Sequence, residues 1–261
     1  MLQTRAEQDH PKASQLSIGH PRCQIHADVR QKTISILAFT PTPVWERPQN
    51  NYGSNRWVVY SPKLDRVVIL YSDLEHDRWV LIESDPLIAT FCEQPFRISI
   101  KLASGRVVTV FDFWLRWKCG CEELEEVKYK DQLESSARVI RQLTAQRKWT
   151  DLQSFRYTIS TEEVIRANPI RLTNWKRMLS QLGATNSVNV DPHTDAVTGL
   201  LLKAGRLPLS EIEMRLRPLD SMLVRSAVFK LIHAGKADAE FLNSKPLNGS
   251  TIVEVTQNGN Q

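Results

Sequence analysis

The first regular pattern along the chain is a pair of short runs rich in β-branched and aromatic residues, Trp57–Tyr60 and Arg66–Tyr71. Two such runs on either side of a short polar segment predict a β-hairpin. Ser72 follows directly, with Glu75 three residues further on, which is the spacing of a helix capping box. An imperfect helical stripe of apolar residues then leads to Ser84–Pro86. We therefore expect a helix capped by Ser72 that carries Glu75 in its first turn.

The next stretch alternates strand-like segments with turn signals, among them Ser104–Gly105 and Lys118–Cys121. A helix over Gln132–Lys148, with apolar residues at helical spacing, is expected to cover the sheet that these strands form. The expected strands are Ile88–Cys92, Phe96–Leu102, Arg106–Trp117, Glu123–Lys130 and Phe155–Ile159.

The C-terminal part of the chain is predicted to be mostly helical. A short helix follows Ser160 and stops before Pro169, and a β-hairpin over Ala239–Phe241 and Thr251–Val255 closes the chain. Helix, turn, helix and β-hairpin in this order is the plan of a winged helix. Its second helix carries Arg225 and Lys230, which suit phosphate contact or a solvated face equally well. The longer helices are expected at Leu172–Leu182, Asp195–Lys203, Ser210–Leu216 and Ser221–His233, with Gly183, Gly205 and Gly235 at three of their ends.

These patterns divide an α/β chain into three parts. Residues 1–30 are polar, show no period and are expected to form a loose arm. Residues 31–168 open with a short element in Lys32–Thr40 and a Pro-rich loop over Pro41–Asn55, and they hold most of the strands. Residues 169–261 form the predicted winged helix.

The amino-acid composition excludes only a few classes of protein. The 261 residues suffice for two moderate domains, and 41% hydrophobic residues support a packed core. A net charge of +5 and a pI near 9.1 fit a polyanionic partner, although many other proteins share these values. The sequence has no apolar run of roughly 18 residues and no signal-peptide core at its start, so we expect a cytoplasmic protein without a membrane span.

The cysteines show no disulfide framework, which favours a reducing compartment. Cys119 and Cys121, separated by Gly120, could form half of a zinc site, but no second pair stands at ligand spacing. A tight hairpin turn is the favoured interpretation of this segment. The remaining cysteines are Cys23 and Cys92.

Four residues between Tyr71 and Lys130 form the candidate catalytic set: Glu75, Asp112, Glu126 and Lys128. Asp112 stands in an otherwise apolar strand, where a carboxylate is costly unless a cation or hydrogen bonds compensate it. Glu126 and Lys128 are two residues apart on a strand and therefore share a face. Since adjacent strands lie about 4.8 Å apart, Asp112 and Glu126 can reach one ion. Magnesium suits such oxygen ligands, and Lys128 would activate the attacking water or offset phosphoryl charge.

Two simpler interpretations stay open for these residues. Glu75 could be a capping carboxylate and nothing more. The charged residues of Glu123–Lys130 could belong to a strand with a solvated surface.

Four short motifs between Ser72 and Lys128 resemble in their order and spacing those of the TnsA family. The members of this family are the endonuclease subunits of heteromeric transposases. The segment from Ser160 to Asn174 is also similar to the junction between this family's domains. The resemblance is best over residues 55–180, and it implies a restriction-endonuclease-like, PD-(D/E)xK fold for the N-terminal domain. The motifs are Ser72–Asp77, Glu93–Phe96, Phe111–Phe113 and Glu126–Lys128.

The resemblance implies roles for the candidate residues. Glu75, Asp112 and Glu126 would bind Mg²⁺, for which Mn²⁺ can substitute, and Lys128 would be the catalytic lysine. Family members can carry Gln where this chain has Glu126. Phe111 stands where Pro is usual, a change that removes no ligand. Gln94 matches a family position and is expected to be structural or to orient the substrate.

The resemblance also implies a function in cut-and-paste DNA transposition. The chain would hydrolyse the strands that bear the 5′ ends of the transposon, while a TnsB-type DDE transposase cuts and joins the 3′ ends. A TnsC-type AAA+ ATPase regulator is a further expected partner, with the C-terminal domain as its docking surface. The expected location is the bacterial cytoplasm, on the nucleoid when the protein is active.

Two rival functions fit the same residues. One is another PD-(D/E)xK nuclease, such as a restriction or junction-resolving enzyme. The other is a non-catalytic winged-helix DNA-binding or adaptor protein, which would not need a divalent metal.

Overall fold

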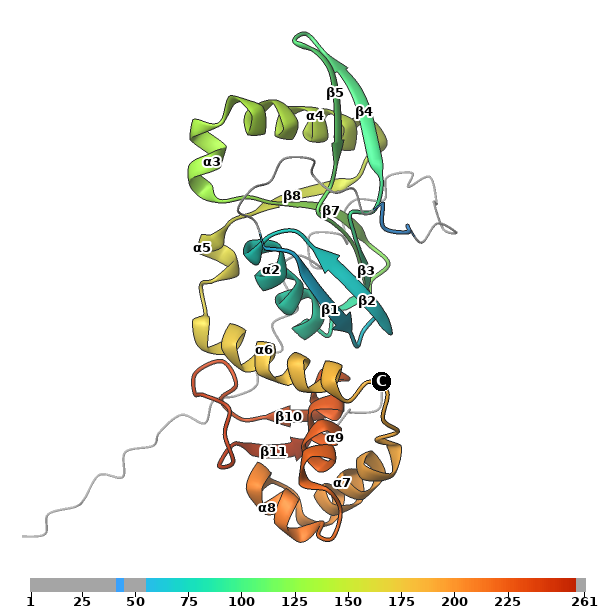
Figure 1. The fold of residues 1–261 in the computed structure, drawn as a ribbon, viewed down its shortest axis with the longest axis vertical. Helices are drawn as coiled ribbons and strands as arrows, with labels where there is room; N and C mark the ends of the chain where they lie inside the picture. The colour runs from blue at the N-terminus through green and yellow to red at the C-terminus, as the bar shows by residue number, and fades with distance from the viewer. Residues whose placement is uncertain (1–40, 45–54, 257–261) are drawn as a thin grey trace, which may run out of the picture. The chain divides into compact units, whose positions relative to one another are not determined.

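A computed structural model describes residues 41–44 and 55–256 of the chain, which belong to one unit over Phe39–Gln261. The predictions for residues 1–30 and for Lys32–Thr40 lie outside the described residues. The described chain has a mixed α/β architecture with several small sheets and eight helices (Figure 1). No helix among the described residues is long and apolar enough to cross a membrane.

The predicted hairpin and the helix after it are confirmed. Strands β1 (Trp57–Ser61) and β2 (Arg66–Leu70) pair antiparallel, and α2 (Asp73–Ser84) follows. The hydroxyl of Ser72 accepts a hydrogen bond from the backbone N–H of Glu75 at 3.1 Å, which caps the helix. The capping box therefore fixes where α2 begins and places Glu75 in its first turn.

A four-stranded mixed sheet lies at the centre of the candidate nuclease part. Its order is β3-β6-β7-β8, with antiparallel pairs β3–β6 and β6–β7 and a parallel pair β7–β8. The parallel pair is possible because two helices lie between its strands in the sequence. The four strands are β3 (Ile88–Glu93), β6 (Phe113–Trp117), β7 (Glu122–Val127) and β8 (Arg156–Ser160).

The predicted single strand over Arg106–Trp117 is wrong. It is two strands, β5 (Gly105–Val110) and β6, which belong to different sheets because β5 pairs only with β4 (Arg97–Leu102). Asp112 lies at the break, where its backbone N–H donates to the carbonyl of Glu125 at 3.1 Å. This bond replaces strand pairing at the point where the chain passes from the outer hairpin to the central sheet.

The predicted helix over Gln132–Lys148 is also two elements, α3 (Lys130–Ser135) and α4 (Ala137–Gln153). Ser136 separates them because its hydroxyl caps α4 by accepting from the N–H of Val139 at 3.3 Å. Strand β7 correspondingly ends at Val127, earlier than predicted. Helix α4 lies along the β4–β5 hairpin and β8 (Figure 1). It packs there through an aromatic cluster of Phe96, Phe111, Trp149 and Tyr157.

The C-terminal part follows the predicted order of elements with shifted starts. Helix α6 begins at Pro169 rather than Leu172, because Asn168 caps it and proline suits the first turn. It also runs past Gly183. Helix α7 likewise begins four residues early, with Pro192 in its first turn. The elements are α5 (Glu162–Ile165), α6 (Pro169–Ala184), α7 (Asp191–Ala204), β9 (Leu207–Pro208), α8 (Leu209–Arg215), α9 (Ser221–His233), β10 (Ala237–Ala239) and β11 (Ile252–Val255).

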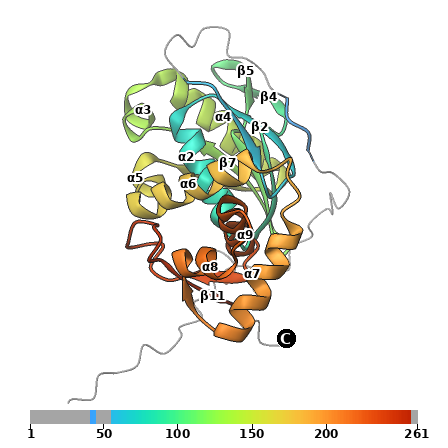
Figure 2. The same cartoon turned by 60° about the horizontal axis from the view of Figure 1, so that its bottom comes forward.

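Strands β9, β10 and β11 form a small antiparallel sheet in the order β10-β11-β9, beside α7, α8 and α9 (Figure 2). Positive φ angles at Gly205 (79°) and Gly235 (70°) end α7 and α9 as predicted. Buried apolar residues form one cluster from Val68 through α6 to Val253. Polar links cross the same region, since Arg171 donates to the hydroxyl of Ser84 at 3.0 Å. A domain boundary between residues 168 and 169 stays a prediction.

Candidate active site

Asp112 sits in the gap between β5 and β6 with its carboxylate directed at β7. The carboxylate accepts from the backbone N–H of Val127 at 2.7 Å and lies 3.5 Å from Nζ of Lys128. The backbone of the gap is held as well, because the N–H of Gln94 donates to the carbonyl of Asp112 at 2.9 Å. The side chain of Asp112 stays 16% exposed, so a ligand can reach it.

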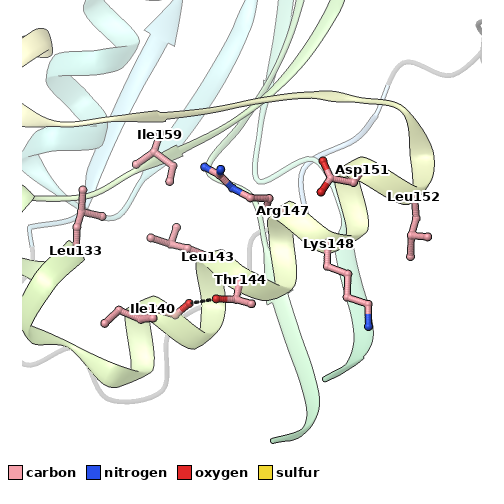
Figure 3. A pocket seen from close by; sticks show the side chains of 9 residues that line it. All are labelled: Leu133, Ile140, Leu143, Thr144, Arg147, Lys148, Asp151, Leu152 and Ile159. Atoms are coloured by element: carbon pink, nitrogen blue, oxygen red, sulfur yellow. Dashed lines mark hydrogen bonds between the residues drawn. The ribbon is translucent and has the colours of Figure 1, made fainter. Parts of the chain in front are cut away.

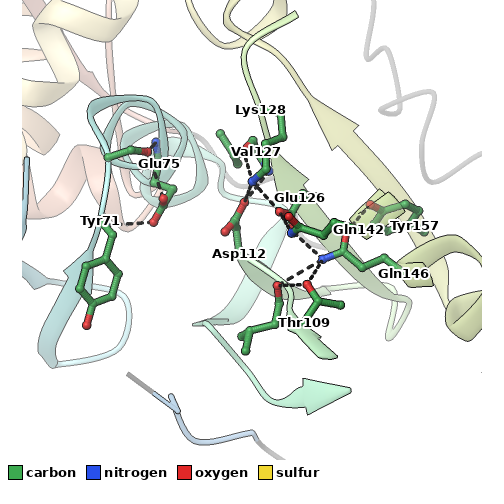
Figure 4. Close-up of polar contacts among 12 residues, drawn as sticks. Tyr71, Glu75, Thr109, Asp112, Glu126, Val127, Lys128, Gln142, Gln146 and Tyr157 are labelled. Atoms are coloured by element: carbon green, nitrogen blue, oxygen red, sulfur yellow. Dashed lines mark hydrogen bonds and ion pairs between the residues drawn. The ribbon is translucent and has the colours of Figure 1, made fainter. Parts of the chain in front are cut away.

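Glu126 and Lys128 meet as their spacing predicts. Nζ of Lys128 lies 2.5 Å from Oε1 of Glu126, whose side chain is fully buried. Lys128 also donates to the carbonyl of Val127 at 3.0 Å. The lysine ammonium therefore bridges the Asp112 and Glu126 carboxylates (Figure 4).

Two glutamines on α4 complete the surroundings of Glu126, and the sequence analysis missed them. Gln142 donates to Oε1 of Glu126 at 2.6 Å, and Gln146 donates to Oε2 at 2.7 Å (Figure 4). The hydroxyl of Tyr157 on β8 donates to Oε1 of Gln146 at 2.8 Å, which fixes the orientation of its amide. The sequence does contain a sign of this contact. Gln142 and Gln146 are four residues apart in a helix that is expected to cover the sheet, and this spacing places both side chains on one face of the helix.

Glu75 reaches the site from the first turn of α2. Its carboxylate accepts from the backbone N–H of Tyr71 and from the hydroxyl of Ser72, both at 3.0 Å. In the view of Figure 4, Asp112 lies between Glu75 and Glu126. Burial, and next the charge of Asp112, raise the pKa of Glu75 to about 8. Capping thus accounts for the hydrogen bonds of Glu75, but not for its electrostatic coupling to Asp112.

The pKa values of Glu126 and Lys128 are shifted by the same two factors, burial and neighbouring charges. Burial, and next the charge of Asp112, raise the pKa of Glu126 to about 7. Burial alone would lower the pKa of Lys128, but the charges of Asp112 and Glu126 outweigh it and raise that pKa. Lys128 is therefore a firmly protonated cation in this arrangement.

A buried ion pair joins the two elements that carry Glu75 and Glu126. The guanidinium of Arg78 on α2 forms a two-pronged contact with Glu125 on β7, at 2.7 and 2.9 Å. The hydroxyl of Ser160 on β8 also donates to Glu125. Because Glu125 is fully buried, this contact fixes how α2 lies against the sheet.

The carboxylate oxygens of this site are ligands of the kind that a hard divalent cation prefers. The carboxylates of Glu75, Asp112 and Glu126 belong to one site. Burial, and next the charge of Asp112, raise the pKa values of Glu75 and Glu126, and a bound cation would relieve the cost of ionising these two groups. In the arrangement seen here, the described residues contain no group of three Asp, Glu, His or Cys side chains placed to hold a metal ion. Gln142, Gln146 and Lys128 occupy the Glu126 oxygens. Metal binding would have to displace at least one of these contacts.

The interpretation of Glu123–Lys130 as a strand with a solvated surface is wrong. The β7 strand is not solvated, since Glu123, Glu125 and Glu126 are fully buried. Cys119 and Cys121 flank a tight turn in which Gly120 has a φ of 83°, as the hairpin interpretation predicts.

The basic residues on the second helix of the predicted winged helix have carboxylate partners. Arg225 and Lys230 on α9 form ion pairs with Glu213 and Asp191, at 2.7 and 2.8 Å.

A lysine ammonium bridges two carboxylates at the end of β7, an inner strand of the four-stranded mixed sheet, an arrangement compatible with a restriction-endonuclease-like domain. Comparison with protein families agrees with this class. Residues 85–162 match the model described as "TnsA-like endonuclease N terminal", which supports the TnsA family assignment. Asp112, Glu126 and Lys128 lie inside the matched residues, and Glu75 lies before them. A search of curated proteins found no match.

Proposed function

We propose that this chain is a magnesium-dependent DNA endonuclease subunit of a transposase, which hydrolyses the 5′-end strands at transposon ends. The observation that carries the proposal is the meeting of Asp112, Glu126 and Lys128 inside a TnsA-like endonuclease domain, with Glu75 beside them. Magnesium, with manganese as a substitute, is the cofactor that this donor set suits.

The proposed chemistry assigns a role to each residue. Glu75, Asp112 and Glu126 would hold Mg²⁺, which supplies Lewis-acid stabilisation of the phosphoryl oxygens and a more acidic water. Lys128 is held as an ammonium, so its role is to offset the negative charge that develops on the phosphoryl group. Gln142 and Gln146 orient the Glu126 carboxylate from α4.

We extend the proposal to partners and to the C-terminal part. A TnsB-type DDE transposase would process the 3′ ends, and a TnsC-type AAA+ ATPase would regulate assembly. The order α7, β9, α8, α9, β10 and β11 supports a winged helix. The carboxylate partners of Arg225 and Lys230 favour protein contact over DNA contact for α9, because neutralised cations attract phosphates less.

Strand cleavage on a labelled transposon-end duplex, with Mg²⁺ and the cognate DDE transposase, tests this proposal. Wild type should cut the 5′-end strand, and both Asp112→Ala and Asp112→Asn should not. The asparagine variant keeps an acceptor for the Val127 N–H, so its failure to cut would not reflect misfolding. Asp151→Ala, on an exposed face of α4, is the control that should keep cutting. A cut made equally by the Asp112 variants would reject the assigned site.

A further inference from the structure

A second polar surface adjoins the candidate active site. It is a groove of about 500 Å³ between strand β5 and the first half of α4, with Asp112 in its lining. Three arginines line it from both sides, one on β5 and two on α4. The residues used below are Gln94, Arg106, Asp112, Arg138, Arg141 and Gln142.

The guanidinium groups of this groove are exposed and have no carboxylate partner. Within residues 41–44 and 55–256, Arg106, Arg138 and Arg141 form no ion pair, whereas Arg66, Arg78 and Arg166 each do. Unneutralised arginines beside a cluster of carboxylates give the groove the charge that a phosphodiester backbone requires.

The three arginines have different environments. Arg141 donates to the backbone carbonyls of Ser104 and Arg106, both at 3.2 Å, and thereby holds the β4–β5 turn against α4. Arg106 and Arg138 have no such bonds among the described residues, so their guanidinium groups can bind a ligand.

Gln94 supplies an independent sign of a ligand. Its backbone has a φ of 43°, a left-handed conformation uncommon for a residue other than glycine. Its backbone N–H donates a hydrogen bond to the carbonyl of Asp112, which fixes this conformation next to the candidate active site. Gln94 lines the groove, and its side-chain Oε1 is buried and has no hydrogen-bond partner in the described part of the chain. A buried amide oxygen without a partner is costly, which a bound ligand would relieve.

We propose that this groove binds the DNA strand that is cut, with Arg106 and Arg138 on phosphates beside the scissile one and Gln94 on the nucleotide next to Asp112. The proposal rests on the nuclease function above and adds where the strand runs. Arg141 acts as a positioning residue, because it holds the turn that presents Arg106.

Binding measured without cleavage tests this subsite separately from the chemistry. The probe is a fluorescein-labelled duplex of about 30 base pairs, followed by anisotropy in EDTA over a salt series. For the Arg106→Ala/Arg138→Ala double variant, the slope of log affinity against log salt should fall by about 2, since each lost phosphate contact lowers it by about 1. Gln94→Glu, which keeps the side-chain shape and adds a negative charge, should also bind more weakly.

Arg147→Ala is the matched control. Arg147 is an exposed arginine on the same helix, but it lines a different and largely apolar hollow between α4 and β8, with Leu143 and Ile159 (Figure 3). Its loss should leave the slope of the wild type unchanged. A double variant with the slope of the wild type, or wild type that binds no duplex, would overturn the proposed subsite, and unchanged binding by Gln94→Glu would remove Gln94 from it. Cleavage by wild type that depends on Asp112 would still support the nuclease function in each of these cases.

Discussion

At the scale of single residues, Lys128 is the most informative group in the site. The neighbouring carboxylates raise its pKa, and its ammonium contacts both Asp112 and Glu126. With no metal ion beside the carboxylates the lysine is held as an ammonium, which suits the electrostatic role proposed above.

We predict that Lys128→Ala abolishes strand cleavage and keeps Mn²⁺ binding, because the substitution removes a cation and no ligand. Cleavage assays and calorimetric titration with Mn²⁺ measure the two properties on the same preparation. Lys130→Ala is the control, since Lys130 starts α3 and pairs with Glu163 on the surface. If Lys128→Ala retained cutting, the assigned role would be wrong.

At the scale of elements, the site depends on how α2 lies against β7. The Arg78–Glu125 pair is the direct polar link between them, and both side chains are nearly or fully withdrawn from solvent. Removing one partner of a buried pair leaves the other charge without compensation, which costs far more than losing a surface pair.

Glu125→Ala should therefore lower the free energy of unfolding by about 3–5 kcal/mol, measured by urea denaturation. The matched control is Glu163→Ala, which breaks the exposed pair with Lys130 and should leave stability unchanged. Equal effects of the two substitutions would show that Glu125 does not hold α2 in place.

At the scale of the whole molecule, the proposed metal joins segments that are far apart in the sequence. Glu75 belongs to α2, Asp112 to the break between β5 and β6, and Glu126 to β7. Burial and the charge of Asp112 disfavour the ionised forms of Glu75 and Glu126, so ionising these two groups destabilises the fold when no metal ion is bound.

The stabilisation of the fold by a metal ion should consequently increase with pH. The folded-state pKa values of Glu75 and Glu126, about 8 and about 7, lie above the ordinary value of 4.5. The unfolded chain loses these protons near pH 4.5, whereas the folded protein keeps them up to about pH 7 to 8, so stability in EDTA should fall as the pH rises from about 4.5 to about 8. Mg²⁺ needs the ionised carboxylates, so it should raise Tm more at about pH 8.5 than at about pH 6.

Differential scanning fluorimetry at both pH values measures this effect. Glu126→Gln is the comparison, because it removes one titrating group and keeps an oxygen ligand. It should reduce the pH dependence of the Mg²⁺ effect. An Mg²⁺-induced shift in Tm that is the same at both pH values would argue against these carboxylates as ligands.

Local sequence rules determined much of this protein. The capping box at Ser72, the β1–β2 hairpin, the turn at Gly120 and the boundaries of α9 follow from short-range hydrogen bonds and φ preferences that few residues encode. The two-residue spacing of Glu126 and Lys128 also predicted their contact, because strand geometry is local.

The tertiary structure decided what depends on partners distant in the sequence. The break at Asp112 arises because β5 and β6 pair with different strands, and the apolar run Val107–Trp117 does not encode that choice. Gln142 and Gln146 contact Glu126 only because α4 packs across the sheet. The pKa values of Glu75 and Glu126 depend in the same way on burial and on a charge from another segment. The sequence by itself thus named the candidate residues, whereas packing between distant segments set their charges, their hydrogen bonds and the groove beside them.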